Sequence, residues 1–188
     1  VMQPVGFDDI HGVSLPTGYY LHPGHSWIKM EEQGVVRIGI DDFAARLFGK
    51  FDHFKAPLIG KELSQGTPMV TLGREDHAIQ FVAPVSGVLI EVNTALLKNP
   101  ELLNASPYTD GWIFMVHCPN LKAERKELMF MSSCNDFMDS EVERLYEFIE
   151  EETQLKAADG GQLVSDIYGN LPGVEWDRLK DKFIPQGE

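Results

Sequence analysis

The 188-residue sequence contains little cysteine, no long apolar stretch and fewer basic than acidic residues. Two cysteines, Cys118 and Cys134, cannot form a disulfide-rich scaffold, so a reducing compartment fits best. No apolar run approaches the roughly 20 residues that a membrane-spanning helix needs. The first residues, Val-Met-Gln-Pro, lack the basic and apolar regions of a signal peptide. These absences predict a cytoplasmic protein and no membrane contact for this segment.

The charge of the chain is strongly negative. Acidic residues outnumber basic ones by 29 to 16, which gives a formal net charge of −13. Such a chain repels phosphate backbones and anionic lipid, so nucleic acid is not expected as a partner. The simplest role of the charge is solubility.

Short segments with strand-like patterns dominate the chain from Ser26 to about His117. In residues 35–40 (Val-Val-Arg-Ile-Gly-Ile), apolar side chains recur at every second position, which is the period of a half-buried strand. Residues 69–72 and 78–82 flank the polar segment 73–77, and this arrangement predicts a β-hairpin with an exposed tip. Many short strands at such spacing indicate a compact β-sandwich or barrel.

The segments before and inside this β region predict different structures. Residues 1–24 are rich in glycine, proline and histidine, and we interpret them as an irregular arm. Asp41 can cap a short helix, and Gly49 can end it in a left-handed conformation. This helix is expected to cover the open end of a sheet.

The last part of the chain predicts helices. Asn120 can cap a helix that runs to about Phe130, and Ser140 with Glu143 matches a capping box. A break at Gly160-Gly161 and a loop over 166–173 are expected. Two apolar stripes follow helical spacing: Val142, Leu145, Tyr146 and Ile149, and then Trp176, Leu179 and Phe183. The second stripe could bind a partner, but folding back on its own domain is the simpler interpretation.

Four motifs follow one another in an order and spacing that one known family shares. They are residues 25–28 (His-Ser-Trp-Ile), 39–44 (Gly-Ile-Asp-Asp-Phe-Ala), 83–87 (Ala-Pro-Val-Ser-Gly), and 99–104 (Asn-Pro-Glu-Leu-Leu-Asn) with 107–108 and 111–112. They resemble the motifs of the glycine cleavage system H-protein family. The resemblance covers about residues 20–117 well and continues loosely to about residue 148.

The resemblance implies a mainly β fold of the lipoyl-domain type. This is the barrel-sandwich hybrid of lipoyl and biotinyl carrier domains, with short helices and, here, a helical C-terminal extension. The expected parts are an N-terminal arm (1–24), an H-protein-like barrel-sandwich hybrid (25–118) and a helical C-terminal extension (119–188).

The residue that defines a carrier is missing. In the family, a lysine at the hairpin tip forms an amide with lipoic acid, and its long stem lets the lipoyl group visit several active sites. Counting back from Ala83, this position falls on Asp76, which has a carboxylate where the amide requires an amine. No lysine lies between Lys61 and Lys98, so a small register shift does not restore one. We therefore expect no lipoyl cofactor.

The neighbours of Asp76 do not replace the lysine. Arg74, Glu75 and His77 share the predicted tip, and neither Arg74 nor His77 can serve as the lipoyl acceptor. Acid–base catalysis by this group would require a cleft that perturbs its pKa values, whereas a hairpin tip is normally solvated. The tip is interpreted as a polar turn or, if functional, as a docking epitope.

No metal site is predicted. His22 and His25 lie three residues apart, but a metal would need further ligands. The resemblance makes His25 a structural residue.

The expected function is that of a non-catalytic, H-protein-like module that lacks lipoylation and acts through protein–protein contacts. Lipoate-dependent or redox enzymes are the expected class of partner, by family analogy alone. Two alternatives stay open. The chain could be a working lipoyl carrier of glycine cleavage, modified at another lysine such as Lys61 or Lys98. It could instead be a structural domain of a larger redox or membrane-associated protein.

Overall fold

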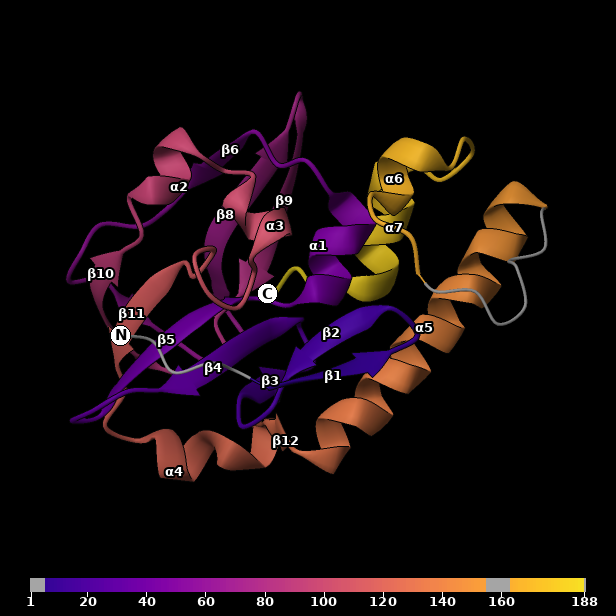
Figure 1. Cartoon of the computed structure of the whole chain (residues 1–188). Helices are drawn as coiled ribbons and strands as arrows, with labels where there is room; N and C mark the ends of the chain where they lie inside the picture. Colours follow the sequence, from indigo (N-terminus) through magenta and orange to yellow (C-terminus); the bar gives the residue numbers. More distant parts are fainter. Residues whose placement is uncertain (1–5, 155–162, 188) are drawn as a thin grey trace.

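The computed structural model describes residues 6–154 and 163–187, which form three antiparallel β-sheets with helices packed around them (Figure 1). The prediction of a mainly β fold with short helices and a helical C-terminal part is confirmed. Within the described residues, no helix combines the length and apolar character needed to cross a membrane.

The largest sheet has seven strands in the order β12-β3-β4-β5-β11-β10-β7. These strands are β3 (Tyr20–His22), β4 (Ser26–Met30), β5 (Val35–Ile40), β7 (Glu62–Leu63), β10 (Gly87–Val92), β11 (Phe114–His117) and β12 (Met129–Phe130). The alternation in β5 has the predicted effect, because Val36, Ile38 and Ile40 are buried in the core. Between β10 and β11 the chain forms α2 (Ala95–Lys98) and α3 (Leu102–Ala105).

A three-stranded sheet, in the order β6-β8-β9, contains the predicted hairpin. Its strands are β6 (His53–Lys55), β8 (Pro68–Arg74) and β9 (His77–Val82). Strands β8 and β9 form the hairpin, and β6 pairs with the other edge of β8. Strand β9 is therefore an edge strand, and helices from the C-terminal part of the chain lie beside it (Figure 1).

Helix α1 (Asp42–Phe48) begins as predicted, because the Asp41 carboxylate accepts a hydrogen bond of 2.8 Å from the backbone N–H of Ala44. Six of its seven residues are buried, so packing stabilises a helix that would be too short to persist alone. The predicted left-handed ending is wrong. Gly49 has φ 0° and ψ 160°, and the side chain of Asp166 lies where a Cβ would point.

The described part of the N-terminal arm is not irregular, and this prediction was wrong. Strands β1 (Phe7–Ile10) and β2 (Val13–Pro16) form a hairpin that packs against the long C-terminal helix, and β3 joins the main sheet. Val13 and Leu15 are buried, which is the two-residue period of a strand. The alternating segment is only four residues long, and the glycine, proline and histidine residues around it indicate an irregular chain.

The predicted helix over 121–130 is shorter than expected. Helix α4 (Leu121–Glu124) continues only as a 3₁₀ turn (Arg125–Glu127), and the Asn120 side chain makes no capping hydrogen bond. Residues 129–130 instead pair with β3 as strand β12. Phe130 stacks on Tyr20 with ring centroids 4.5 Å apart, and this cross-strand contact favours the strand over further helix.

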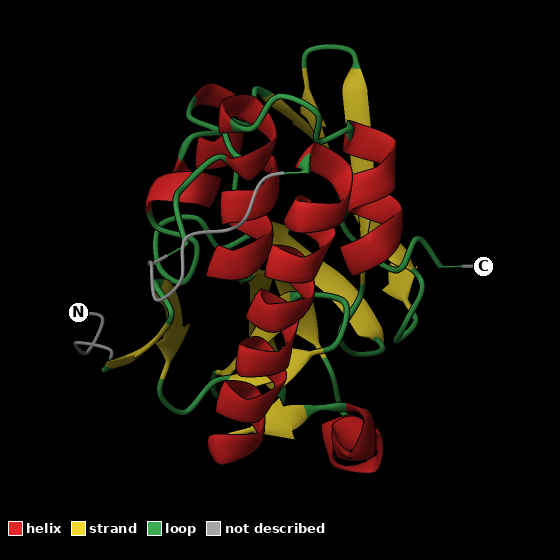
Figure 2. Cartoon of the chain, turned by 90° about the vertical axis from the view of Figure 1, so that its right-hand side faces the viewer, coloured by secondary structure: helices red, strands yellow, loops and turns green. Residues whose placement is uncertain are grey.

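The long helix α5 (Ser132–Thr153) begins before the predicted capping box. Ser140 lies inside it, so that prediction was wrong. Of the predicted apolar stripe, Val142, Leu145 and Ile149 are buried and Tyr146 is partly buried against the core. Figure 2 shows this helix crossing the face of the molecule turned towards the viewer.

After the gap in the described residues, two helices complete the chain. Helix α6 (Ile167–Asn170) lies where a loop was expected, and α7 (Trp176–Phe183) follows the second predicted stripe. The predicted break at Gly160-Gly161 lies outside the described residues.

A buried histidine joins α5 to the β domain. The His25 ring is fully buried between two carboxylates, with Nδ1 2.7 Å from Asp41 and Nε2 2.7 Å from Glu141. Burial alone would lower the pKa of His25, but the two carboxylates outweigh it and raise the pKa to about 9. A protonated ring donates from both nitrogens, so it satisfies both carboxylates at once. Arg144 also contacts Glu141 and donates to the carbonyl of Lys182, which extends the network to α7.

This geometry predicts a loss of stability at alkaline pH. Because the folded-state pKa of His25 lies above its usual 6.5, the stabilisation is fully present below pH 6.5 and is lost as the pH rises through about 9. The substitution His25→Gln should lower the free energy of unfolding by about 3–5 kcal/mol, since it leaves two carboxylates buried without a cation. Urea unfolding at a series of pH values measures both effects.

The exposed His53 provides the matched control. His53→Gln should leave the decline in stability between neutral and alkaline pH unchanged, whereas His25→Gln should flatten it. An unaltered decline in the His25 variant would assign the effect to another group.

Candidate functional site

The hairpin tip is a two-residue turn, narrower than the five-residue polar segment that the sequence predicts. Arg74 pairs with His77, and only Glu75 and Asp76 lie between the strands. Glu75 has φ 56°, the left-handed backbone that tight hairpin turns require. The Asp76 side chain is 91% exposed. The hairpin projects from the sheet, at the top of the molecule in Figure 1.

Asp52 holds the tip from the side of β6. Its carboxylate accepts a 2.6 Å hydrogen bond from the backbone N–H of Glu75 and lies 2.5 Å from Nδ1 of His53. The backbone hydrogen bond from Glu75 is the main cause that lowers the pKa of Asp52. The His53 ring lies so close to Gly73 that a Cβ there would meet it at 1.8 Å. Glycine therefore permits β6 to approach the hairpin.

Arg74 is not part of a solvated turn, and this prediction was wrong. Its side chain is only 13% exposed. Nη1 donates to the carbonyl of Gly49 at 2.7 Å and to Oδ1 of Asp166 at 2.5 Å, and the guanidinium lies 5.2 Å from the ring of Tyr168. Partial burial alone would raise the pKa of Asp166, but the hydrogen bond from Arg74 lowers it. Arg74 thus joins the hairpin to the end of α1 and the start of α6.

His77 is covered by the same C-terminal segment. Its Nε2 lies 3.0 Å from the hydroxyl of Tyr168, and its ring stacks on Trp176 with centroids 5.2 Å apart at 18°. Trp176 also donates to the carbonyl of Ala78 at 3.1 Å. The stripe of Trp176, Leu179 and Phe183 is buried, so the prediction that it folds back on its own domain is confirmed.

The end of the chain continues along β9. Gln186 exchanges two hydrogen bonds with the backbone of Gln80, one at 3.4 Å and one at 3.3 Å. An uncovered edge strand presents free backbone donors and acceptors to other proteins. Here residues 163–187, which we call the clamp segment, cover that edge and the flank of the hairpin.

The chemistry available at the tip is limited. Of the four predicted site residues, Arg74 and His77 contact the clamp segment, His77 with 37% of its side chain exposed, and Glu75 and Asp76 are fully on the surface. Their exposure gives no cleft for acid–base catalysis. Within the part of the chain that the structure describes, no group of three or more histidines, cysteines and acids could hold a metal ion.

The other candidate residues lie away from the tip. His25 is held by carboxylates, while Nδ1 of His22 accepts from the N–H of Gly24, so the two do not form a ligand pair. Lys61 is the last residue of the β6–β7 loop and Lys98 ends α2, and neither lies on the hairpin. Both cysteines are buried, and burial raises the pKa of Cys134 to about 11, which keeps it as an unreactive thiol.

Sequence reasoning missed Asp166 and Tyr168 as neighbours of the hairpin. Asp166 adopts a left-handed conformation and accepts from the N–H of Gly169, so it caps α6 while it binds Arg74. An acid one residue before Ile-Tyr-Gly-Asn is a weak helix signal, and nothing local connects it to a residue 92 positions earlier. Trp176 did carry a signal, because it belongs to the second apolar stripe.

Comparison with known proteins shows which family this scaffold resembles. The family model described as "Glycine cleavage H-protein" matches residues 19–141. A "Probable glycine cleavage system H protein" of Thermococcus kodakarensis is 37% identical over 126 residues, which are 67% of this chain and 93% of the relative. A protein of the same description from Pyrococcus horikoshii is 38% identical over 115 residues, 61% of this chain and 85% of the relative.

A solved structure agrees with the sequence relatives. The crystal structure of a glycine cleavage system H protein from Mycobacterium marinum has a TM-score of 0.52 and 27% identity, and the match covers 56% of this chain and 87% of that chain. The expected barrel-sandwich fold of the lipoyl-domain type is confirmed by this likeness. The match to the family model includes the hairpin but not the β1–β2 hairpin or the clamp segment.

The clamp contacts predict that changes in α6 loosen the hairpin. Asp166→Asn should lower the free energy of unfolding by about 1.5–3 kcal/mol, because Arg74 loses a charged hydrogen-bond partner. It should also speed amide hydrogen exchange in β8 and β9 more than in β4 and β5. Exchange measured by mass spectrometry tests this.

The matched control is Glu152→Gln, which removes the exposed ion pair with Arg178 on the same side of the molecule. It should lower the free energy of unfolding much less than Asp166→Asn does, and it should leave the hairpin protected. Equal exchange in both variants would show that the Arg74 contact does not hold the hairpin.

Proposed function

The chain belongs to the glycine cleavage H-protein family, and we propose that within it this protein is a non-lipoylated module that acts through protein–protein contacts. The observation that supports this most directly is Asp76 at the exposed tip of the hairpin. The hairpin, its flanking strands and the turn over 83–87 are all present. Aspartate therefore replaces the family's lysine in a hairpin whose fold is otherwise complete.

The tip residues do not fit a lipoyl group. Attachment to a side chain as an amide requires a primary amine, and both exposed side chains of the turn, Glu75 and Asp76, have carboxyl groups. Arg74 lies beside them, but its guanidinium is engaged with Asp166 and the α1 carbonyls. A lipoyl group therefore has no acceptor amine in this turn.

The surface of the hairpin suits docking. The clamp segment covers the flank and the free edge of β9, so a partner that approaches the tip meets Glu75, Asp76 and the neighbouring Asp52. Since its pKa is lowered, Asp52 stays charged at neutral pH. The tip thus presents negative charge on a fixed base, which favours a partner with a basic surface. We propose lipoate-dependent or redox enzymes as the class of partner.

Intact mass tests the absence of the lipoyl group. After co-expression with a lipoyl ligase and a supply of lipoate, the chain should keep its unmodified mass, because no amine stands at the tip. An H protein that retains the tip lysine, treated in parallel, should gain one lipoyl group. A lipoyl-sized increment on this chain would overturn the proposal, and peptide mapping would then show whether Lys61 or Lys98 accepts it.

A further inference from the structure

A polar pocket of about 410 Å³ lies beside α1, and no residue of the β8–β9 hairpin lines it. Three parts of the chain form its walls: the β1–β2 hairpin, helix α1 and residues 104–109. The first of these lies outside the match to the family model, so the pocket is not a feature of the matched region alone. Its volume falls in the range of small-molecule sites, roughly 300–1,000 Å³. We call it the α1 pocket.

Hydrogen bonds join the three walls of the α1 pocket to one another. The Tyr108 hydroxyl donates to the carbonyl of Ser14 at 2.7 Å and accepts from the backbone N–H of Asp42 at 2.8 Å. The N–H of Ser14 donates to the Asp42 carboxylate at 2.9 Å. The walls are therefore fixed before any ligand binds, and such preorganisation lowers the cost of binding.

Asp42 and Arg46 form an ion pair that leaves part of each side chain free. Nε of Arg46 donates to Oδ2 of Asp42 at 2.8 Å, and Nη1 donates to the carbonyl of Leu163 at 2.9 Å. Oδ1 of Asp42 and Nη2 of Arg46 have no hydrogen-bond partner among the described residues. The Arg46 and Asp42 side chains are 27% and 10% exposed, and both line the pocket. The pocket therefore offers one carboxylate oxygen and one guanidinium N–H from the same ion pair.

The remaining lining combines polar and apolar groups. Ser106 and Thr109 contribute hydroxyls, and Phe7 contributes a ring that is 52% exposed. Asn104 donates to the carbonyl of Ala45 at 3.0 Å, while its buried Oδ1 has no hydrogen-bond partner within the described part of the chain. Because buried acceptors are normally paired, a ligand that brings an N–H group suits this lining.

We propose that the α1 pocket binds a free α-amino acid with an apolar side chain, as its zwitterion. The ammonium group donates to Asp42, the carboxylate accepts from Arg46, and the side chain lies against Phe7. Asp42 and Arg46 are the only charged residues of the lining, so a ligand without net charge fits it. A free anion would instead be repelled by Asp42 and by a chain with a net charge of −13. In a peptide the two charged termini lie apart, so a peptide does not bring both charges to one ion pair.

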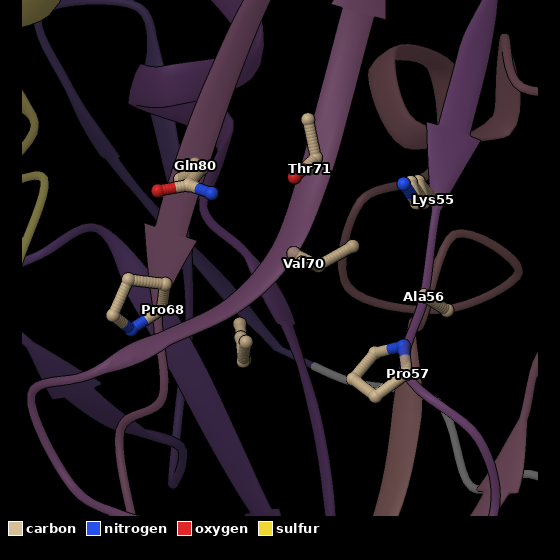
Figure 3. A pocket seen from close by; sticks show the side chains of 8 residues that line it. Lys55, Ala56, Pro57, Pro68, Val70, Thr71 and Gln80 are labelled. Atoms are coloured by element: carbon tan, nitrogen blue, oxygen red, sulfur yellow. The ribbon is translucent and has the colours of Figure 1, made fainter.

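Another hollow does not offer this combination. It has a volume of about 290 Å³ and lies between the chain at Lys55–Pro57 and strand β8 (Figure 3). Lys55 is the only charged residue among those that line it, so it has no acid for an ammonium group. The α1 pocket shares no residue with the hairpin tip, and this proposal therefore stands or falls separately from the proposed function.

Calorimetric titration of the purified chain with L-phenylalanine and two analogues tests the zwitterion. Hydrocinnamate lacks the ammonium group and phenethylamine lacks the carboxylate, while both keep the ring. L-Phenylalanine should bind at least about tenfold more tightly than either, because each analogue leaves one charged group of the pocket without its partner. Equal or tighter binding of one analogue would overturn the proposal, and so would the absence of L-phenylalanine binding at millimolar concentration.

Variants and amide resonances locate the site. Arg46→Gln should weaken the binding of L-phenylalanine by about tenfold or more. The matched control is Arg178→Gln, which removes an arginine from another ion pair and should leave the affinity within about twofold. In the unaltered chain, L-phenylalanine should shift the amide resonances of Ser14 and Asp42 but not that of Glu75 in the hairpin turn. Equal weakening by the two variants, or shifts confined to the hairpin, would place the ligand elsewhere and overturn the proposal.

Discussion

A buried imidazolium between two carboxylates holds the long C-terminal helix against the β domain. Asp41 is at once the cap of α1 and one partner of His25, and Glu141 brings in α5 from the opposite side. A buried charge is tolerated only when it is fully paired, so the position of each of these three side chains depends on the other two. At the other end of α1, Arg74 donates to the carbonyls of Phe48, the last helical residue, and of Gly49, which follows it. The short buried helix is therefore fixed at both ends by charged groups.

This arrangement explains how the parts of the chain outside the family match become part of the fold. The β1–β2 hairpin packs on α5, and the backbone N–H of Leu163 donates to the carbonyl of His11. Helices α6 and α7 pack on α1 and on the β8–β9 hairpin. Apolar side chains of α7 belong to the same continuous core as those of the sheets. The additions therefore share one core with the barrel, and they restrict access to the β8–β9 hairpin from one side.

The sequence is informative where the structural signal is local. Periodicity locates β5 and α7, short apolar segments around a polar one locate the hairpin strands, and a side-chain cap locates the start of α1. Prediction from the sequence fails where a contact with a distant part of the chain decides the structure. Stacking of Phe130 on Tyr20 replaces the end of a predicted helix by a strand, and contacts with Asp166 and Trp176 partly cover two residues of the predicted polar tip. Arg74 and His77 gave no local sign of these partners, because their contacts lie about ninety residues further along the chain.

The exposed turn at Glu75 and Asp76 has a consequence for how this family can diversify. The Asp76 side chain packs against little, and surface substitutions of this kind usually change stability by less than about 0.5 kcal/mol. The hairpin is held by other residues. The Asp52 side chain accepts from the backbone of the turn, and the Arg74 side chain donates to the chain at the end of α1. A substitution at position 76 can thus change the chemistry of the tip without changing the stability of the fold. A lineage can lose or regain an amine at this one point without passing through a poorly folded intermediate.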